Sequence, residues 1–303
     1  MRTARALAVV LCAVGFLLIL IPSTSPSQTA LESALAAYGE ENVKGYMQPF
    51  ADLFGANMNS GYYWTAKVPV AGFTFEFDII TMGAMVGDSE KKFDATTPDG
   101  FTPATFESAT IFGEKGGLVT DSPSQLSYRG ADGVFNTSMM PLATPQIKIG
   151  SLFGTEFLGR GVYLPALGDN FESTTMWAIG ARHNVSQWFG TLPVDLSAGI
   201  YYSSLSTGDL ISFNGLMIGA QASKEFGVLT VYGGLGYQSS TLTLKYDSTV
   251  PSAPGTVELE LDGKNNVAFT VGAGLSFGVF KVFADINVGS VTNLSGGIGF
   301  GGM

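Results

Sequence analysis

Bulky apolar and polar residues alternate repeatedly along the chain, from about residue 73 to the C-terminal region. The clearest example is residues 73–79, FTFEFDI, in which every second residue is apolar. Successive side chains of a β-strand point to opposite faces, so such a strand turns one face to lipid and the other to a polar interior. The pattern predicts an all-β fold, a transmembrane antiparallel β-barrel that occupies residues 59–303.

Strands of about ten residues, the length that a tilted strand needs to cross a membrane, can be placed along this region. We expect them at 62–70, 72–82, 104–112, 145–153, 156–164, 172–181, 193–203, 210–223, 228–239, 242–246, 256–261, 267–277, 280–288 and 292–300. The short pair 242–246 and 256–261 can equally be the ends of two long strands joined by a hairpin outside the membrane. Single-chain bacterial barrels have even strand numbers, so we expect about 12 strands, in a range of about 10–14.

Strand parity assigns the polar side chains to the lumen. A charge on the lipid side costs several kcal/mol near the membrane centre, so the charged set should face inward. The candidate lumen-facing residues are Thr74, Glu76, Asp78, Arg160, Asp195, Lys281 and Asp285. An inward arginine needs a carboxylate partner or an anionic ligand. Glu76, Asp78 or Asp195 could pair with Arg160, and we favour such structural pairing over binding of a carboxylate-bearing substrate.

Glycines repeat on the inward parity of the later strands, as in Gly234 and Gly236 and again in Gly272 and Gly274. Small inward residues make room for a ligand or a plug, and they also let a small barrel curve. Curvature is the simpler explanation.

The N-terminus has the pattern of a secretory signal peptide, which we place at residues 1–27. Arg2 and Arg5 precede an apolar run over residues 6–21, followed by small and turn-forming residues. The run is shorter than the about 20 residues that a spanning helix needs, so a membrane anchor is the weaker alternative. The only cysteine, Cys12, lies in this run, so the cleaved chain would have no disulfide and no cysteine nucleophile.

Residues 28–58 form the one segment with helical periodicity after the signal peptide. We expect two short helices broken near Gly39. This segment is either a periplasmic extension packed on the barrel rim or a plug that enters the lumen. Its candidate plug or gate residues are Tyr46, Phe50 and Phe54.

The alternation lapses in a long irregular insertion around residues 84–144, which is polar and rich in proline and glycine. A connection of this length is usually functional or disordered. It could be an extracellular loop, a loop folded into the lumen, or both. Residues 87–93 can form a helical turn within it.

Composition agrees with a barrel and limits its partners. Charged residues make up 13% of the chain, against about 25% in an ordinary soluble domain. A barrel needs fewer because one face of each strand meets lipid. The formal net charge of −10 disfavours nucleic acid as a partner. We therefore expect outer-membrane lipid as a partner and no nucleic acid.

The sequence offers few candidate residues for catalysis or metal binding. His183 is the only histidine, and a Ser-His-acid site would have to use it, but no serine lies in a nucleophile-elbow context. The acidic group at 88–94 lacks the spacing of a calcium loop, and the one at 258–262 alternates as a strand does. We expect no enzyme activity, no catalytic residue, no metal site and no cofactor, and we interpret His183 as a structural residue at a strand end.

Several loose motifs resemble a known group of proteins. They are residues 46–50 (YMQPF), 59–67 (NSGYYWTAK), 88–93, 155–165 with Arg160, and the turn after His183. Together they resemble an uncharacterised outer-membrane β-barrel family found chiefly in the Bacteroidota, which is distantly similar to the FadL-type long-chain fatty-acid transporters. The resemblance implies a location in the outer membrane of a diderm bacterium and a channel for hydrophobic solutes, in which an N-terminal segment plugs the barrel.

Two functional hypotheses follow. The first is a passive channel or transporter for small, hydrophobic molecules. The second is a non-conducting structural, assembly or partner-docking barrel. A continuous lumen or a lateral opening would favour the first hypothesis, and a lumen filled by side chains would favour the second.

Overall fold

The computed structural model describes residues 35, 38–166, 172–248 and 255–302. The predicted signal peptide and the first residues of the N-terminal segment lie outside the described residues. Among the residues that are described, none of the helices has the length and apolar character needed to cross a membrane.

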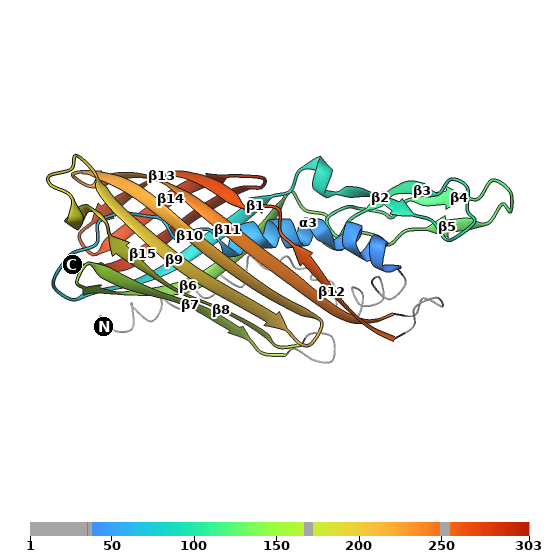
Figure 1. Ribbon diagram of the computed structural model, residues 1–303, viewed down its shortest axis with the longest axis horizontal. Coiled ribbons are helices and arrows are strands. Elements are labelled where there is room, and N and C mark those ends of the chain that lie inside the picture. The colour runs from blue at the N-terminus through green and yellow to red at the C-terminus, as the bar shows by residue number, and fades with distance from the viewer. Residues whose placement is uncertain (1–34, 36–37, 167–171, 249–254, 303) are drawn as a thin grey trace, which may run out of the picture.

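Ten antiparallel strands close into a barrel (Figure 1). They are β1 (Thr74–Met85), β6 (Met139–Leu152), β7 (Thr155–Leu164), β8 (Thr174–Asn184), β9 (Asp195–Thr207), β10 (Ile211–Phe226), β11 (Leu229–Ser248), β13 (Val267–Phe277), β14 (Phe280–Val288) and β15 (Thr292–Gly302). The ring closes because β1 pairs with β15 as well as with β6. An eleventh strand, β12 (Gly255–Asp262), lies outside the ring and pairs with the far part of β11.

Ten strands lie at the lower limit of the expected range of about 10–14, below the central value of about 12. Residues 62–70, predicted as the first strand, form no strand, because most of them cross the lumen and they pair with no neighbouring strand. The strand predicted at 104–112 is β3 (Thr105–Ala109), which pairs only with β2 (Lys92–Thr96) outside the barrel. The segment predicted at 242–246 is the end of β11, as the hairpin alternative proposed.

The wall follows the predicted parity. Outward apolar side chains such as Phe77, Ile200 and Phe269 are 38%, 51% and 54% exposed. Glu76 and Asp78, the two neighbours of Phe77 in the sequence, are buried. So much exposed apolar surface on one molecule marks a face that meets lipid or another protein. A continuous outward apolar band around a closed barrel is typical of a lipid-facing wall.

The two ends of the barrel differ. At one end, which we call the turn end, β10 and β11 are joined by Gly227 and Val228, and β13 and β14 by Gly278 and Val279. The connection from β8 to β9 is longer there and contains η3 (Ser186–Trp188). The opposite end carries the long β1–β6 connection. Membrane barrels of bacteria have short periplasmic turns and longer extracellular loops, and the difference between these two ends has the same form, with the turn end in the place of the periplasmic turns.

Residues 86–138 form an extension beyond the other end of the barrel (Figure 1). It contains η1 (Asp88–Glu90), which is the helical turn predicted near residue 90. Two antiparallel hairpins follow, one from β2 and β3 and one from β4 (Leu118–Thr120) and β5 (Ser127–Arg129). Of the locations left open by the sequence, the insertion thus occupies the space outside the barrel.

The helix α3 (Glu40–Met58) runs from the extension into the mouth of the barrel (Figure 1). Gly39 immediately precedes it, at the position where the sequence predicted a break, and Pro49 lies within it. Residues 59–68 then pass through the lumen without regular secondary structure, and residues 69–73, most of them exposed, lead to β1 at the turn end.

The parity of the wall generates a first prediction. Ala284 faces outward in the middle of β14, so Ala284→Arg should lower the free energy of unfolding by about 2–4 kcal/mol, the cost of an arginine at the bilayer midplane. Ala284→Leu is the matched control and should change it little. Urea unfolding in lipid vesicles measures both. Equal stability of the two variants would contradict the lipid-facing assignment.

Asp121 in the extension generates a second prediction. Its carboxylate accepts hydrogen bonds from the Ser124 hydroxyl, from the Thr102 N–H at 2.8 Å and from the Ser124 N–H at 2.9 Å. These bonds, the Ser124 hydroxyl first, hold the pKa of Asp121 below its ordinary value.

A lowered pKa means that the carboxylate stabilises this turn above the unfolded pKa of about 3.9 and loses that effect as the pH falls through the folded value. Amide-exchange protection factors in β4 and β5 should therefore fall on acidification below about pH 4, whereas those in β13 and β14 should not. Asp121→Asn should remove most of this pH dependence. Unchanged pH dependence in that variant would assign the effect to other groups.

Candidate functional site

The lumen is filled by the chain itself. We call residues 59–68 the strap, because they cross the lumen and are fastened to its wall. Tyr62, Tyr63 and Trp64 of the strap are only 5%, 4% and 3% exposed. They form a core with side chains from the wall, namely Ile80, Met82, Leu158, Tyr201, Met217, Tyr232 and Phe283. The interior therefore contains a packed aromatic core at the level of the strap.

Inward glycines make space for these rings. A methyl group on Gly219 or Gly234 would collide with Tyr63, and one on Gly274 would collide with Trp64. The sequence favoured curvature as the reason for the inward glycines. The contacts show that those against the strap provide room for a plug, because the aromatic rings occupy the volume that wall side chains would otherwise take.

Arg160 is the central contact between the wall and the strap. Its Nη1 donates to the carbonyl oxygen of Ser60 at 2.9 Å, and its Nη2 donates to that of Gly61 at 2.5 Å. Its Nε donates to Gln146 Oε1 at 2.7 Å. The guanidinium also stacks on Tyr62, with Cζ at 3.9 Å from the ring centre. One buried side chain thus fixes three consecutive strap residues.

The local backbone of the strap suits this contact. Gly61 has a φ of +69°, a conformation that glycine adopts at little cost. A side chain there would also press on Ile80, which lies 2.7 Å from the position of a Cβ. Tyr62 in turn stacks on Tyr201 with 4.2 Å between ring centres.

The expected carboxylate partner of Arg160 is not in direct contact with it. Gln146 lies between them, because its Nε2 donates to Asp78 Oδ2 at 2.8 Å while its Oε1 accepts from Arg160. The hydrogen-bond partners of Arg160 are therefore two backbone carbonyls and an amide, in place of the carboxylate expected from the sequence.

Further wall residues hold the rest of the strap. Arg182 Nη1 donates to the Thr65 carbonyl at 2.5 Å, and Asn184 Nδ2 donates to the Val68 carbonyl at 2.6 Å. Ser223 Oγ accepts from the Ala66 N–H at 2.8 Å. These bonds go to backbone groups of the strap, so they satisfy an irregular segment that has no strand partner.

A buried charge cluster lies beside the strap near the turn end. Both Lys148 and Lys281 form ion pairs with Glu76, and Lys148 Nζ also lies 3.2 Å from Asp78 Oδ2. Lys148, Glu76 and Asp78 are 5%, 8% and 0% exposed. Two cations and two carboxylates balance there, as buried charges require.

The remaining lumen-facing candidates lie apart from this cluster. Asp285 is buried and accepts from the Tyr232 hydroxyl at 2.9 Å and from Asn287 Nδ2 at 2.7 Å. Thr74 is buried at the beginning of β1. Asp195 is only partly buried at the first position of β9, close to the turn end. The seven candidates therefore do not form one site.

The predicted plug residues of α3 link the barrel to the extension. The Tyr46 hydroxyl donates to the Asp132 carbonyl at 2.9 Å. Phe50 stacks on Phe54 at 5.5 Å and contacts the rings of two residues of the extension, Phe112 and Phe135. Phe54 meets the barrel residue Phe213 edge to face, at 5.0 Å. Tyr46 and Phe50 thus contact the extension, and Phe54 contacts the wall.

Sequence reasoning did not single out Gln146, Lys148, Glu156 and Arg182, which complete the network. Arg182 Nε donates to Glu156 Oε1 at 2.8 Å. The signal that could have found them is parity, because Gln146 and Lys148 alternate with Ile147 and Ile149 along β6.

His183 lies near the end of β8, next to η3. Its Nδ1 is 2.9 Å from Thr155 Oγ1, its Nε2 is 2.5 Å from Gln187 Nε2, and its ring packs on Trp188. Both ring nitrogens therefore have neutral partners. Within the described ranges, no group of three or more His, Cys, Asp or Glu side chains is placed to hold a metal ion.

The Arg160 contacts generate a third prediction. Arg160→Met should lower the free energy of unfolding by about 2–4 kcal/mol, because it leaves two buried carbonyls and Gln146 without their donor. It should also lower amide-exchange protection in residues 60–66 more than in β13 and β14.

The matched control is Arg129→Met, which removes an exposed arginine whose ion pair with Asp132 should contribute little. Urea unfolding and amide exchange in detergent micelles measure both variants. Equal unfolding free energies and equal amide-exchange protection in the two variants would contradict the role of Arg160 in holding the strap in place.

Comparison with solved structures gives several membrane barrels at low similarity. The outer membrane protease OmpT from Escherichia coli is 9% identical, with a TM-score of 0.32, over 80% of this chain and 98% of that chain. The translocator domain of autotransporter NalP from Neisseria meningitidis is 12% identical, with a TM-score of 0.27, over 89% and 99%. The P. putida toluene transporter TodX is 12% identical, with a TM-score of 0.25, over 76% and 67%. These scores are too low to carry an argument about function.

No curated protein sequence matches the chain. A family model does match it over residues 1–302, which is nearly its whole length. The chain therefore belongs to the family of unknown function DUF6588.

Proposed function

We propose that this protein is a non-conducting outer-membrane barrel that holds its extension rigidly at the outer surface for a partner to dock. The observation that supports this most directly is the filled lumen, in which Tyr62, Tyr63 and Trp64 pack against the wall. This was the feature that, on sequence grounds, would favour a structural or docking role over a channel.

The energetics of the strap support a closed barrel. Moving the strap would expose three buried aromatic side chains, each of which favours burial by roughly 1.5–3 kcal/mol. It would also separate Arg160 and Arg182 from the carbonyls that they bind. Water entering an opened lumen would offset part of this second cost. The closed state should still dominate at equilibrium.

The extension can offer a fixed surface to a partner because contacts with α3 hold it in place. Tyr46 and Phe50 of α3 tie it to a helix that is itself seated in the barrel. Apolar side chains remain outside this contact, since Leu118 and Leu126 are 69% and 62% exposed. A rigid element with exposed apolar residues can bind a partner without a large ordering cost.

A second candidate is a gated channel or transporter for small hydrophobic molecules. The observation that favours it is the strap's lack of regular secondary structure, since its backbone is held by side chains whose hydrogen bonds water could replace. The sequence motifs resemble a barrel family that is itself distantly similar to FadL-type transporters, and this resemblance favours the same candidate. Neither candidate includes an enzymatic step, a cofactor or a nucleic-acid partner.

Single-channel recording in planar bilayers tests the proposal. The wild-type protein should insert without discrete conductance steps, because the strap closes the lumen. The double variant Arg160→Met/Arg182→Met measures the effect of loosening the strap, and Arg129→Met is the control. Discrete openings of the wild-type protein that become more frequent in the double variant would overturn the non-conducting role and support the gated channel. Insertion is verified in each case by protease protection of the barrel.

A further inference from the structure

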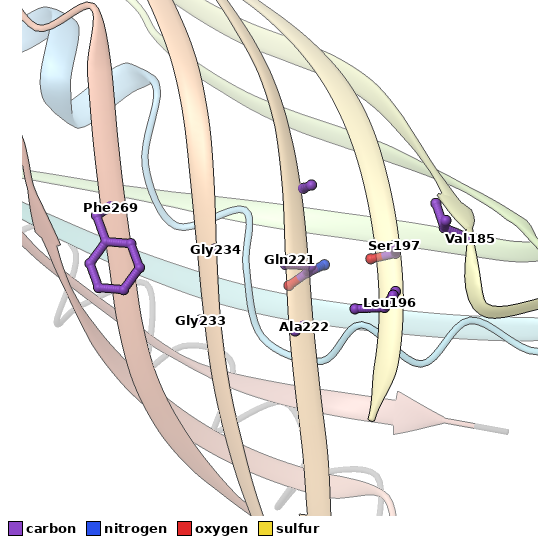
Figure 2. A pocket seen from close by; sticks show the side chains of 9 residues that line it. Val185, Leu196, Ser197, Gln221, Ala222, Gly233, Gly234 and Phe269 are labelled. Carbon is purple, nitrogen blue, oxygen red and sulfur yellow. The ribbon is translucent and has the colours of Figure 1, made fainter. Parts of the chain in front are cut away.

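The outer wall has an apolar groove that the proposed function does not use. It crosses β9, β10, β11 and β13, and Figure 2 shows Leu196 and Phe269 on its two flanks. Its volume is about 440 Å³. Ala220, Ala222 and Gly233 lie between the flanks, so small residues create the depression. This volume falls within the usual range for small-molecule sites of about 300–1,000 Å³.

The groove opens toward lipid rather than toward the lumen. Ala220, Ala222 and Gly233 have the outward parity of Ile218 and Val231, which are 46% and 42% exposed. On the inner side, Gly234 packs against Tyr63 of the strap. The strap therefore closes the wall behind the groove, and an occupant must come from the membrane.

A cation lies on the same face, just beyond the groove. Lys224 continues the outward series Ala220, Ala222 along β10, about 6.6 Å beyond Ala222 toward the turn end. Its side chain is exposed, and among the described residues no carboxylate lies within ion-pair distance of it. The adjacent carboxylate, Glu225, instead pairs with Lys67 at 2.9 Å.

The level of Lys224 in the membrane is marked by large aromatic residues. Trp188, Phe189 and Phe226 are 68%, 56% and 56% exposed at the same end of the barrel. Such girdles lie at the membrane–water interface, at the depth of lipid headgroups. A lysine at this level, with an apolar groove toward the membrane centre, matches a phosphate attached to an acyl chain.

We propose that this face binds one glycerophospholipid of the periplasmic leaflet. One acyl chain lies in the groove against Ala222 and Gly233, and the lipid phosphate pairs with Lys224. The Lys224 ammonium, which lies 5.7 Å from the centre of the Phe226 ring and has no ion pair among the described residues, complements the phosphate. The apolar lining excludes ligands without a hydrocarbon chain. The site does not depend on whether the barrel conducts.

Native mass spectrometry of the full chain with added phosphatidylglycerol tests this proposal. Gly233→Leu should fill the groove and weaken binding by about tenfold or more, because the acyl chain loses its apolar contact area. Only the Thr270 carbonyl oxygen, at 3.2 Å from a Cβ at this position, limits the new side chain. Lys224→Gln should weaken binding by about fivefold, the effect of one basic residue at an anionic lipid surface.

Gly159→Leu is the matched control. Gly159 also faces outward, on β7, and no atom lies within 4 Å of a Cβ placed there. It should bind lipid as the wild type does. Heat-modifiable migration on gels checks that each variant is folded.

The outcomes separate the parts of the proposal. Equal binding by the Gly233→Leu and Gly159→Leu variants would overturn the groove as a lipid site. Loss of binding in Gly233→Leu with no effect of Lys224→Gln would overturn phosphate recognition and leave a site for any apolar molecule. Displacement of the lipid by inorganic phosphate alone would also overturn the acyl-chain contact.

Discussion

The contact on which the rest of the structure depends is that of the Arg160 guanidinium with the carbonyls of Ser60 and Gly61. A chain that crosses a lumen without strand partners must have its backbone polar groups satisfied by side chains, because buried unpaired carbonyls are costly. Arginine suits this role since its planar group donates in several directions and stacks on a ring at once. With Tyr62 held in this way, the neighbouring aromatic residues are directed into the wall, and the lumen closes.

The wall is adapted to the strap in both volume and charge. Inward glycines such as Gly234 and Gly274 accept the rings of Tyr63 and Trp64, which a larger wall residue would exclude. The buried cluster of Glu76, Asp78, Lys148 and Lys281 balances its own charge. Such a cluster contributes little net stability, but removal of one member would leave an uncompensated charge. The interior is therefore organised as a protein core, polar in part and paired throughout the cluster.

The helix α3 connects this interior to the extension outside the barrel (Figure 1). Phe54 packs on the barrel and Phe50 on the extension, so the two parts share one apolar cluster. Because α3 contacts both parts, the long insertion is a folded element that is attached to the barrel through this helix. Functional interest accordingly shifts from the lumen to two surfaces, the extension at one end and the lipid-facing groove near the other.

The sequence by itself determined the barrel, the facing of its side chains and the helical N-terminal segment, because period-two and helical patterns are local properties of the chain. It also placed Arg160 inward and a turn near Glu90. It misplaced residues 62–70, whose alternation of apolar and polar residues also suits a strand. Only the tertiary structure decided that this segment lies in the lumen, that Arg160 binds its carbonyls and that ten strands close the ring. These outcomes depend on which distant residues share the interior volume, and a local pattern carries no information about that.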